Sequence, residues 1–262
     1  MRFEAERDLV CNAVARLKDW GLLDITGGAV SVRAGNGTIL VTPSGTSFRA
    51  WQMVPSDVIA LSPQGEIVDR SSRLAASGTQ LHLAIYETLG QVGAVVHCHA
   101  PYSLVFASLG VPVPSVTNQA DTLGEIPCLI ADDTAVKEQV RSGHLTVPVP
   151  EGIVQRPDVN AVNLIELIPQ LREHFLPRAD EIGRHGLAFT IYRHGAVAMA
   201  RGLYEATENL ARVEVSARTA LFQAILRGGM AGIAANPLFP QDAATNQPTT
   251  HGPATPPVAS AQ

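Results

Sequence analysis

The order of helix-like and strand-like patterns along the 262 residues predicts an α/β fold. Three observations lead to this prediction: an amphipathic repeat near the N-terminus, a hairpin signal directly after it, and two later apolar strands that end in polar residues. A hydrophobic content of 46% over this length is sufficient for a substantial core. The chain has no internal repeat, so we expect a single domain over residues 1–235.

The first predicted element is an amphipathic helix. Its apolar positions recur at helical spacing behind an acidic first turn, at Leu9, Val10, Ala13, Val14 and Leu17. Gly21 stands where such a helix would end. Residues 30–33 and 38–42 then form two strand-like runs around Gly35-Asn36-Gly37, a pattern typical of a β-hairpin. The sheet is therefore expected to begin close to the N-terminus.

Two apolar strands later in the chain lead into histidines. After a helical pattern over residues 79–89, residues 93–96 are apolar and are followed by His97-Cys98-His99. Residues 187–192 form a second such strand, which runs into His194. An apolar run at 196–200 and a long helical pattern over 203–226 follow. Binding and catalytic side chains concentrate where a rigid element gives way to a loop, so both histidine segments are candidates for a site.

Residues 236–262 differ in composition from the rest of the chain. They are rich in Pro, Ala, Thr and Gln and show no apolar periodicity. Such a segment cannot bury enough apolar surface to offset the entropy of ordering it. We therefore predict a disordered tail that takes no part in the chemistry.

Charge and cysteine usage exclude several classes of protein. The 19 basic and 24 acidic residues give a net charge of −5 with no basic run, so we expect no nucleic-acid partner. The three cysteines show no paired spacing, which argues against a disulfide framework and favours a reducing cytoplasm. The N-terminus is charged, and no apolar run approaches the roughly 20 residues that span a bilayer, so no membrane partner is expected.

His97 and His99 form a candidate metal-binding pair. Side chains two residues apart on a strand point to the same face, so both imidazoles can reach one ion. Neutral imidazole binds zinc, manganese, iron or cobalt, and a catalytic ion typically has three protein ligands and one open position. Among the eight histidines, His185 and His194 are each followed by glycine near a strand end, and spacing alone does not choose between them. The pair could also be two ordinary histidines at the end of a strand.

The loop Thr42-Pro43-Ser44-Gly45-Thr46 is a second candidate site. It combines hydroxyl groups with a glycine that lets backbone N–H groups approach a ligand, which suits phosphate or carboxylate. An ordinary turn after a strand has a similar composition, so this motif alone leaves both interpretations open.

Several short motifs occur in a fixed order along the chain. They are Thr26-Gly27-Gly28-Ala29-Val30-Ser31-Val32-Arg33, Thr42-Pro43-Ser44-Gly45-Thr46, His82, His97-Cys98-His99, His194-Gly195 and Glu205-Ala206. In this order and at about this spacing they resemble the class II aldolase/adducin family, over roughly residues 5–230. The family includes fuculose- and ribulose-phosphate aldolases and epimerases, methylthioribulose-phosphate dehydratases and the metal-free adducins. The resemblance implies a central, mostly antiparallel β-sheet flanked by α-helices.

The resemblance also implies a metal centre and an anion site. It implies a divalent ion in each chain, zinc first and otherwise manganese, cobalt or iron, held by His97, His99 and His194. It leaves His185 outside the site and His82 packed beneath it. It implies that a small-molecule substrate is bound at its anionic end by four residues: Ser44, Gly45, Thr46 and Ser77. A fourfold-symmetric homotetramer is a further implication, which no sequence feature establishes by itself.

The chain departs from the family pattern at three positions. Ala29 stands where the aldolases usually have an asparagine that touches the substrate's anionic end. Gly78 stands where they have the glutamate that acts as general acid and base. Ala120 corresponds to a tyrosine that some members use as a proton donor. Loss of a positioned base typically removes a factor of about 10² to 10⁴ from proton-transfer catalysis, so the catalytic residue stays unknown at this stage.

The retained histidines and the missing glutamate together indicate an enzyme, a metal-dependent carbon–carbon lyase that acts on a small anionic hydroxy or keto compound. Two reactions fit: aldol cleavage, if another group removes the proton, and decarboxylation, for example of a hydroxylated aromatic acid, which needs no side-chain base. A three-histidine site could instead serve a non-haem iron oxygenase. A non-catalytic, adducin-like interaction domain is a further alternative, against which the retention of all three histidines argues.

Overall fold

A computed structural model of the chain describes residues 2–24, 27–46, 49–69, 75–76, 78–131 and 164–234. The chain forms two compact units, Met1–Leu221 and Phe222–Gln262. The first unit holds the β-sheet and the candidate site, and the second is described over residues 222–234, which are helical. The predicted tail, residues 236–262, lies outside the described residues. Within the described part of the chain, no helix combines the length and the hydrophobicity needed to cross a bilayer.

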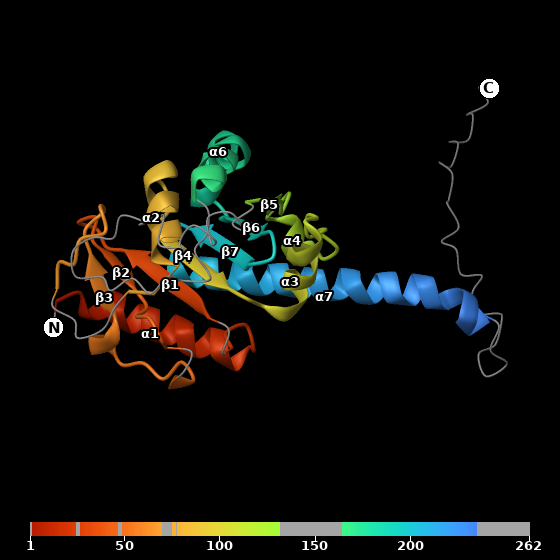
Figure 1. The fold of residues 1–262 in the computed structure, drawn as a ribbon, viewed down its shortest axis with the longest axis horizontal. Helices are drawn as coiled ribbons and strands as arrows, with labels where there is room; N and C mark the ends of the chain where they lie inside the picture. Colours follow the sequence, from red (N-terminus) through yellow and green to blue (C-terminus); the bar gives the residue numbers. More distant parts are fainter. Residues whose placement is uncertain are drawn as a thin grey trace, which may run out of the picture. The chain divides into compact units, whose positions relative to one another are not determined.

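A seven-stranded sheet forms the centre of the first unit (Figure 1). Its strands are β1 (Gly28–Arg33), β2 (Ile39–Val41), β3 (Ile59–Leu61), β4 (Ala94–Cys98), β5 (Cys128–Leu129), β6 (Leu187–Ile191) and β7 (Gly195–Ala200). Their order across the sheet is β3-β2-β1-β4-β7-β6-β5, and every neighbouring pair is antiparallel except β5 with β6. The predicted α/β fold with a mostly antiparallel sheet is confirmed.

Helices flank both faces of this sheet. They are α1 (Glu4–Asp19), α2 (Thr79–Thr88), α3 (Pro101–Leu109), α4 (Asn118–Asp121), α6 (Leu164–Phe175) and α7 (Leu203–Ala234), with the 3-10 segments η2 (Pro55–Asp57) and η3 (Leu176–Gly183). In Figure 1, α2 and α6 lie on one side of the sheet and α1 lies on the other. Each side has its own apolar core, as expected for a sheet that is buried on both faces.

The alternation of side chains along β4 decides which helix meets the candidate site. Ala94, Val96 and Cys98 belong to the core that includes α1 and the first part of α7, whereas Val95 belongs to the core that includes α2 and α6. His97 is two residues beyond Val95 and therefore lies on the same face of the strand. The strand face that carries His97 is thus the face against which α2 packs.

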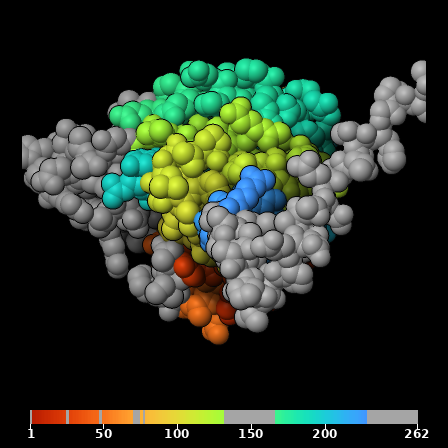
Figure 2. All heavy atoms as spheres, turned by 90° about the vertical axis from the view of Figure 1, so that its right-hand side faces the viewer, coloured from red at the N-terminus to blue at the C-terminus, as the bar shows by residue number. Residues whose placement is uncertain are grey.

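The edge of the sheet at β5 is covered by a side chain of α6. Gln170 accepts a hydrogen bond from the backbone N–H of Ile130 at 2.9 Å and donates one to the carbonyl oxygen of Ile130 at 2.8 Å. Figure 2 shows the green surface of α6 directly beside the yellow-green surface of the segment from α3 to β5. An amide side chain that occupies both backbone groups blocks the pairing of a further strand at that residue.

The predicted elements are present, with small changes at their ends. The opening helix ends at Asp19, and Gly21 follows with a positive φ of 72°. The last helix extends beyond the predicted residue 226 to Ala234. The sequence does not reveal β3 or β5, because runs of three and two residues are too short to show an alternating pattern.

Candidate metal centre

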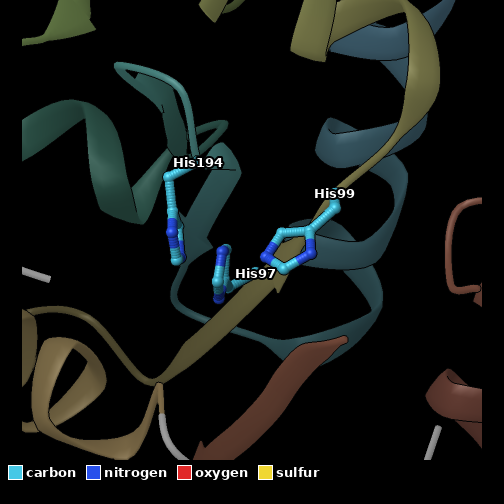
Figure 3. A group of neighbouring side chains, drawn as sticks. All are labelled: His97, His99 and His194. Atoms are coloured by element: carbon cyan, nitrogen blue, oxygen red, sulfur yellow. The ribbon is translucent and has the colours of Figure 1, made fainter. Parts of the chain in front are cut away.

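The three predicted ligand histidines come together at one edge of the sheet. His97 is on β4, His99 follows the last residue of that strand, and His194 lies in the turn between β6 and β7. Because β4 and β7 are paired, with Cys98 opposite Ala196, their ends meet. One nitrogen from each of the three imidazoles lies within 4.8 Å of the others. Figure 3 shows the three rings turned toward one common space.

Backbone geometry on both sides of this cluster holds the rings close together. The turn that carries His194 requires a left-handed residue, and Arg193 takes this conformation with φ of 55°. The His194 N–H donates to the carbonyl of Ile191 at 3.0 Å, which closes the turn. A Cβ atom built on Gly195 would lie 2.4 Å from the carbonyl oxygen of Cys98 and 2.8 Å from Cδ2 of His99. The glycine is therefore what allows β7 to approach the His99 ring.

Burial favours the neutral form of the His97 imidazole. Burial is the main reason that the pKa of His97 lies well below its usual value, and the neighbouring His194, His99 and His82 lower this pKa further. Both ring nitrogens of His97 are buried and have no hydrogen-bond partner within the described part of the chain. Three converging imidazoles are a suitable ligand set for zinc, whose fourth position can take water or substrate. The residues present therefore fit a divalent ion.

The structure separates the two candidates for the third ligand. His185 lies outside the cluster: its Nδ1 is 2.9 Å from the carbonyl oxygen of Gly186, and its Nε2 is 3.8 Å from Glu181. His194 is inside the cluster, with its ring centroid 4.8 Å from that of His97. The pairing of β4 with β7 therefore identifies His194 as the third member of the cluster, which residue spacing alone does not do.

The predicted anion loop follows β2 and is tied to the segment that leads into α2. Ser44 and Gly45 are exposed, and Gly45 has a positive φ of 72°. Thr46 is buried, and its hydroxyl group donates to the carbonyl oxygen of Pro43 at 2.6 Å. The Thr46 hydroxyl thus fixes the loop internally. Ser77, the fourth predicted anion-binding residue, lies outside the described residues.

A short chain of contacts connects this loop with the histidines. Pro43 forms a β-bridge with Ala75, and the Ala76 N–H donates to the carbonyl of Thr42 at 3.1 Å. Gly78 follows, and a Cβ atom built there would lie 3.3 Å from Nδ1 of His97 and 3.5 Å from Cβ of Ala29. Ala29 and Gly78, at which the sequence is expected to depart from the family pattern, are therefore neighbours beside His97.

A buried polar cluster beneath α2 is not evident from the sequence. The Ser31 hydroxyl oxygen on β1 lies 2.7 Å from Nδ1 of His82 and 2.8 Å from the hydroxyl oxygen of Tyr86. Burial lowers the pKa of His82 to about 3, so this imidazole is neutral at pH 7. His82 and Tyr86 are four residues apart on α2, which is the spacing of side chains on one helix face. That spacing is a signal, but it does not point to Ser31, which is remote in the sequence.

Comparison with known proteins agrees with the fold. The sequence pattern of the family described as Class II Aldolase and Adducin N-terminal domain matches residues 8–221. The chain therefore belongs to this family.

Two curated relatives illustrate the range of proteins to which the chain is similar. The 5-methylthioribulose-1-phosphate/5-deoxyribulose-1-phosphate aldolase of Rhodospirillum rubrum is 40% identical over 111 residues, which are 42% of this chain and 48% of that protein. The chain thus aligns with about half the length of that aldolase. The L-ribulose-5-phosphate 4-epimerase UlaF of Salmonella typhi is 26% identical over 214 residues, which are 80% of this chain and 82% of that protein.

Solved structures show the same fold. An L-fuculose 1-phosphate aldolase superposes with a TM-score of 0.62 at 21% identity, covering 86% of this chain and 89% of that chain. The L-fuculose-1-phosphate aldolase of Thermus thermophilus gives a TM-score of 0.60 at 19% identity, covering 84% of this chain and 95% of that chain. At these identities the likeness concerns the fold.

Proposed function

We propose that the protein is a metal-dependent carbon–carbon lyase acting on a small anionic hydroxy or keto compound, with sugar phosphates as the first substrate class to test. The observation that carries the proposal is the convergence of His97, His99 and His194, with ligand nitrogens within 4.8 Å of one another. The names of the relatives support the substrate class, since they act on phosphorylated ketoses. Zinc is the proposed ion, and a homotetramer remains a prediction from the family resemblance.

The proposed division of labour follows from the positions of the residues. A bound divalent ion would supply Lewis acidity, drawing electron density from a carbonyl or hydroxyl oxygen next to the bond that breaks. Ser44 and Gly45 would receive the anionic end of the substrate at an exposed turn whose left-handed glycine leaves backbone N–H groups accessible. The Thr46 hydroxyl would hold this turn in shape through its bond to Pro43.

The source of the proton decides between cleavage of an aldol and loss of carbon dioxide. Gly78 contributes no carboxylate beside His97, so aldol cleavage would need another base. Decarboxylation needs no side-chain base to begin, because the departing carbon dioxide leaves its electron pair on the substrate. Both reactions break a carbon–carbon bond and remain within the proposal.

The test is turnover of defined compounds by the zinc-loaded protein. 5-Deoxyribulose 1-phosphate, L-fuculose 1-phosphate, L-ribulose 5-phosphate and a phosphorylated β-keto acid would each be incubated with the protein, and the products followed by NMR. An aldehyde with a three-carbon or two-carbon fragment supports aldol cleavage, and carbon dioxide supports decarboxylation. Exclusive formation of an epimer would contradict the proposal. Cleavage that continues at the same rate after a chelator has removed the metal would also contradict it.

Restoring a carboxylate at position 78 should increase aldol cleavage. The Gly78→Glu variant places an acid beside His97, and a positioned base is worth about 10² to 10⁴ in rate. The backbone φ of −69° accepts a side chain, although the Cβ would make a tight 3.3 Å contact with the ring. Gly78→Gln is the matched control, since it makes the same contact without an acid. Equal cleavage rates for the two variants would show that a carboxylate at this position does not act as the base.

Loosening the anion loop should weaken substrate binding rather than the chemical step. In Thr46→Val the bond to Pro43 is lost while the shape of the side chain is kept, at a cost of roughly 1 kcal/mol. We expect a several-fold higher KM for a phosphorylated substrate and a kcat within about twofold of the original. Thr207→Val removes a similar bond of 2.7 Å to Leu203 on α7 and should leave KM unchanged. A lower kcat with an unchanged KM would show that Thr46 acts on the chemical step and not on substrate binding.

A further inference from the structure

We propose that His82 is a positioning residue for the metal ligand His97, and that Ser31 and Tyr86 hold His82 in the orientation this requires. The inference rests on the proposed metal site. It concerns a buried polar chain that contributes no ligand of its own: His82, Ser31 and Tyr86.

His82 and His97 lie over the same strip of the sheet. On β1, Ala29 is paired with His97 of β4, and Ser31, two residues further along the same face, is paired with Val95. Directly before α2, the position of Gly78 meets His97 and Ala29, and His82, four residues later on the helix, bonds to Ser31. Gly78 and His82, four residues apart, therefore lie over Ala29 and Ser31, which are two residues apart on β1.

The two ring nitrogens of His97 face different surroundings. The Nδ1 atom lies on the side of α2, 3.3 Å from a Cβ built on Gly78. Figure 3 shows one ring nitrogen of His97 directed toward the other two imidazoles and the second directed away from them. This leaves Nε2 for the ion. A histidine that binds a metal through Nε2 carries its proton on Nδ1, and such a proton almost always has a hydrogen-bond acceptor.

His82 offers an acceptor on that side of the strand. Nε2 of His82 and Nδ1 of His97 are both buried, and neither has a hydrogen-bond partner in the described part of the chain. A buried polar nitrogen without a partner costs roughly 1–3 kcal/mol. A link between the two, direct or through a single water molecule, would satisfy both atoms.

The proton positions in the hydrogen bonds among His82, Ser31 and Tyr86 are consistent with this link. The proton on Nδ1 of His97 would point to Nε2 of His82, directly or through the water molecule. The proton on Nδ1 of His82 is then donated to the hydroxyl oxygen of Ser31, and the Ser31 proton to that of Tyr86. The guanidinium group of Arg33 stands 5.2 Å from the centre of the Tyr86 ring and helps to hold that end in place.

The experiment compares two amide replacements of His82 with opposite geometry. In His82→Asn the amide lies near the original Nδ1 and can keep the bond to Ser31, whereas in His82→Gln it lies near the original Nε2. Zinc affinity would be measured by competition with a chromophoric chelator, the absorption spectrum of the cobalt(II) form would report ligand geometry, and the melting temperature of the metal-free protein would report stability. Loss of such a partner typically lowers metal affinity by about 10- to 100-fold.

We expect His82→Asn to bind zinc about 10- to 100-fold more weakly and to change the cobalt spectrum. His82→Gln keeps an acceptor toward His97 but loses the bond to Ser31, so we expect it to lose no more than several-fold in zinc affinity. Equal zinc affinity in the two variants would overturn the inference. So would losses of zinc affinity that are proportional to the decrease in the melting temperature of the metal-free protein. A protein that binds no zinc with His82 intact would instead refute the proposed function, and this inference with it.

If the amide variants do not fold, a second variant tests the hydrogen bond between Ser31 and Tyr86. Tyr86→Phe removes only the hydroxyl that accepts from Ser31 and should lower zinc affinity several-fold. Tyr204→Phe, which removes an exposed hydroxyl on α7, should have no effect. Unchanged zinc affinity in Tyr86→Phe would contradict the proposed role.

Discussion

Replacing His97 with alanine is expected to remove the bound metal from the purified protein and to abolish turnover. His97 is 3% exposed, and its Nε2 atom is buried without a hydrogen-bond partner among the described residues, so an ion is the partner that this nitrogen calls for. Loss of a residue that only supports a ligand costs about 10- to 100-fold in metal affinity. Loss of a ligand should therefore exceed about 100-fold. Elemental analysis, counting metal per chain, is the measurement.

His185→Ala is the matched control for this experiment. His185 was the other candidate for the third ligand by spacing, and the structure places it against Gly186 and Glu181, outside the cluster. Its variant should retain the metal content of the original protein. Metal lost equally from both variants would assign the effect to general destabilisation.

The identity of the metal also bears on the class of reaction. Zinc, manganese or cobalt in the original protein would support the lyase. Iron would favour a non-haem iron oxygenase, since a three-histidine site with open positions can activate oxygen. No metal in the original protein, even after supplementation, would contradict the metal centre and leave an adducin-like binding domain as the best account.

The candidate site could be predicted from the sequence as far as local patterns reach. His97 and His99 are recognisable as a pair because the alternation of side chains along one strand is a local property. The choice of His194 over His185 depends on the pairing of β4 with β7, which joins segments far apart in the chain. The resemblance to a known family predicts His194, and the structure shows this residue in the cluster.

Other features of the site depend on packing that no single segment encodes. The order of motifs predicts Thr46 as an anion-binding residue, yet only the fold shows that its hydroxyl is bonded to Pro43. The hydrogen bonds among Ser31, His82 and Tyr86 require α2 to lie across β1 in one register. Tertiary contacts of this kind depend on the relative position of two elements, whereas periodicity describes each element alone.

Gly195→Ala is expected to lower both stability and zinc affinity, because it adds a methyl group where two strands meet the metal centre. The new Cβ would lie 2.4 Å from the backbone oxygen of Cys98 and 2.8 Å from Cδ2 of His99. Overpacking of this kind typically costs about 1–3 kcal/mol. We expect a melting temperature lower by several degrees and, because the His99 ring must move, a zinc affinity lower by at least about tenfold.

The control for this variant is Gly202→Ala, at the other end of β7, where a Cβ would meet nothing within 4 Å. It adds the same methyl group and should change neither melting temperature nor zinc affinity appreciably. If Gly195→Ala were less stable but bound zinc as tightly as the control, the strands would have absorbed the clash and His99 would not depend on this glycine. If zinc affinity falls while the metal-free protein remains folded, the close approach of β7 to β4 is what sets the position of the His99 ring.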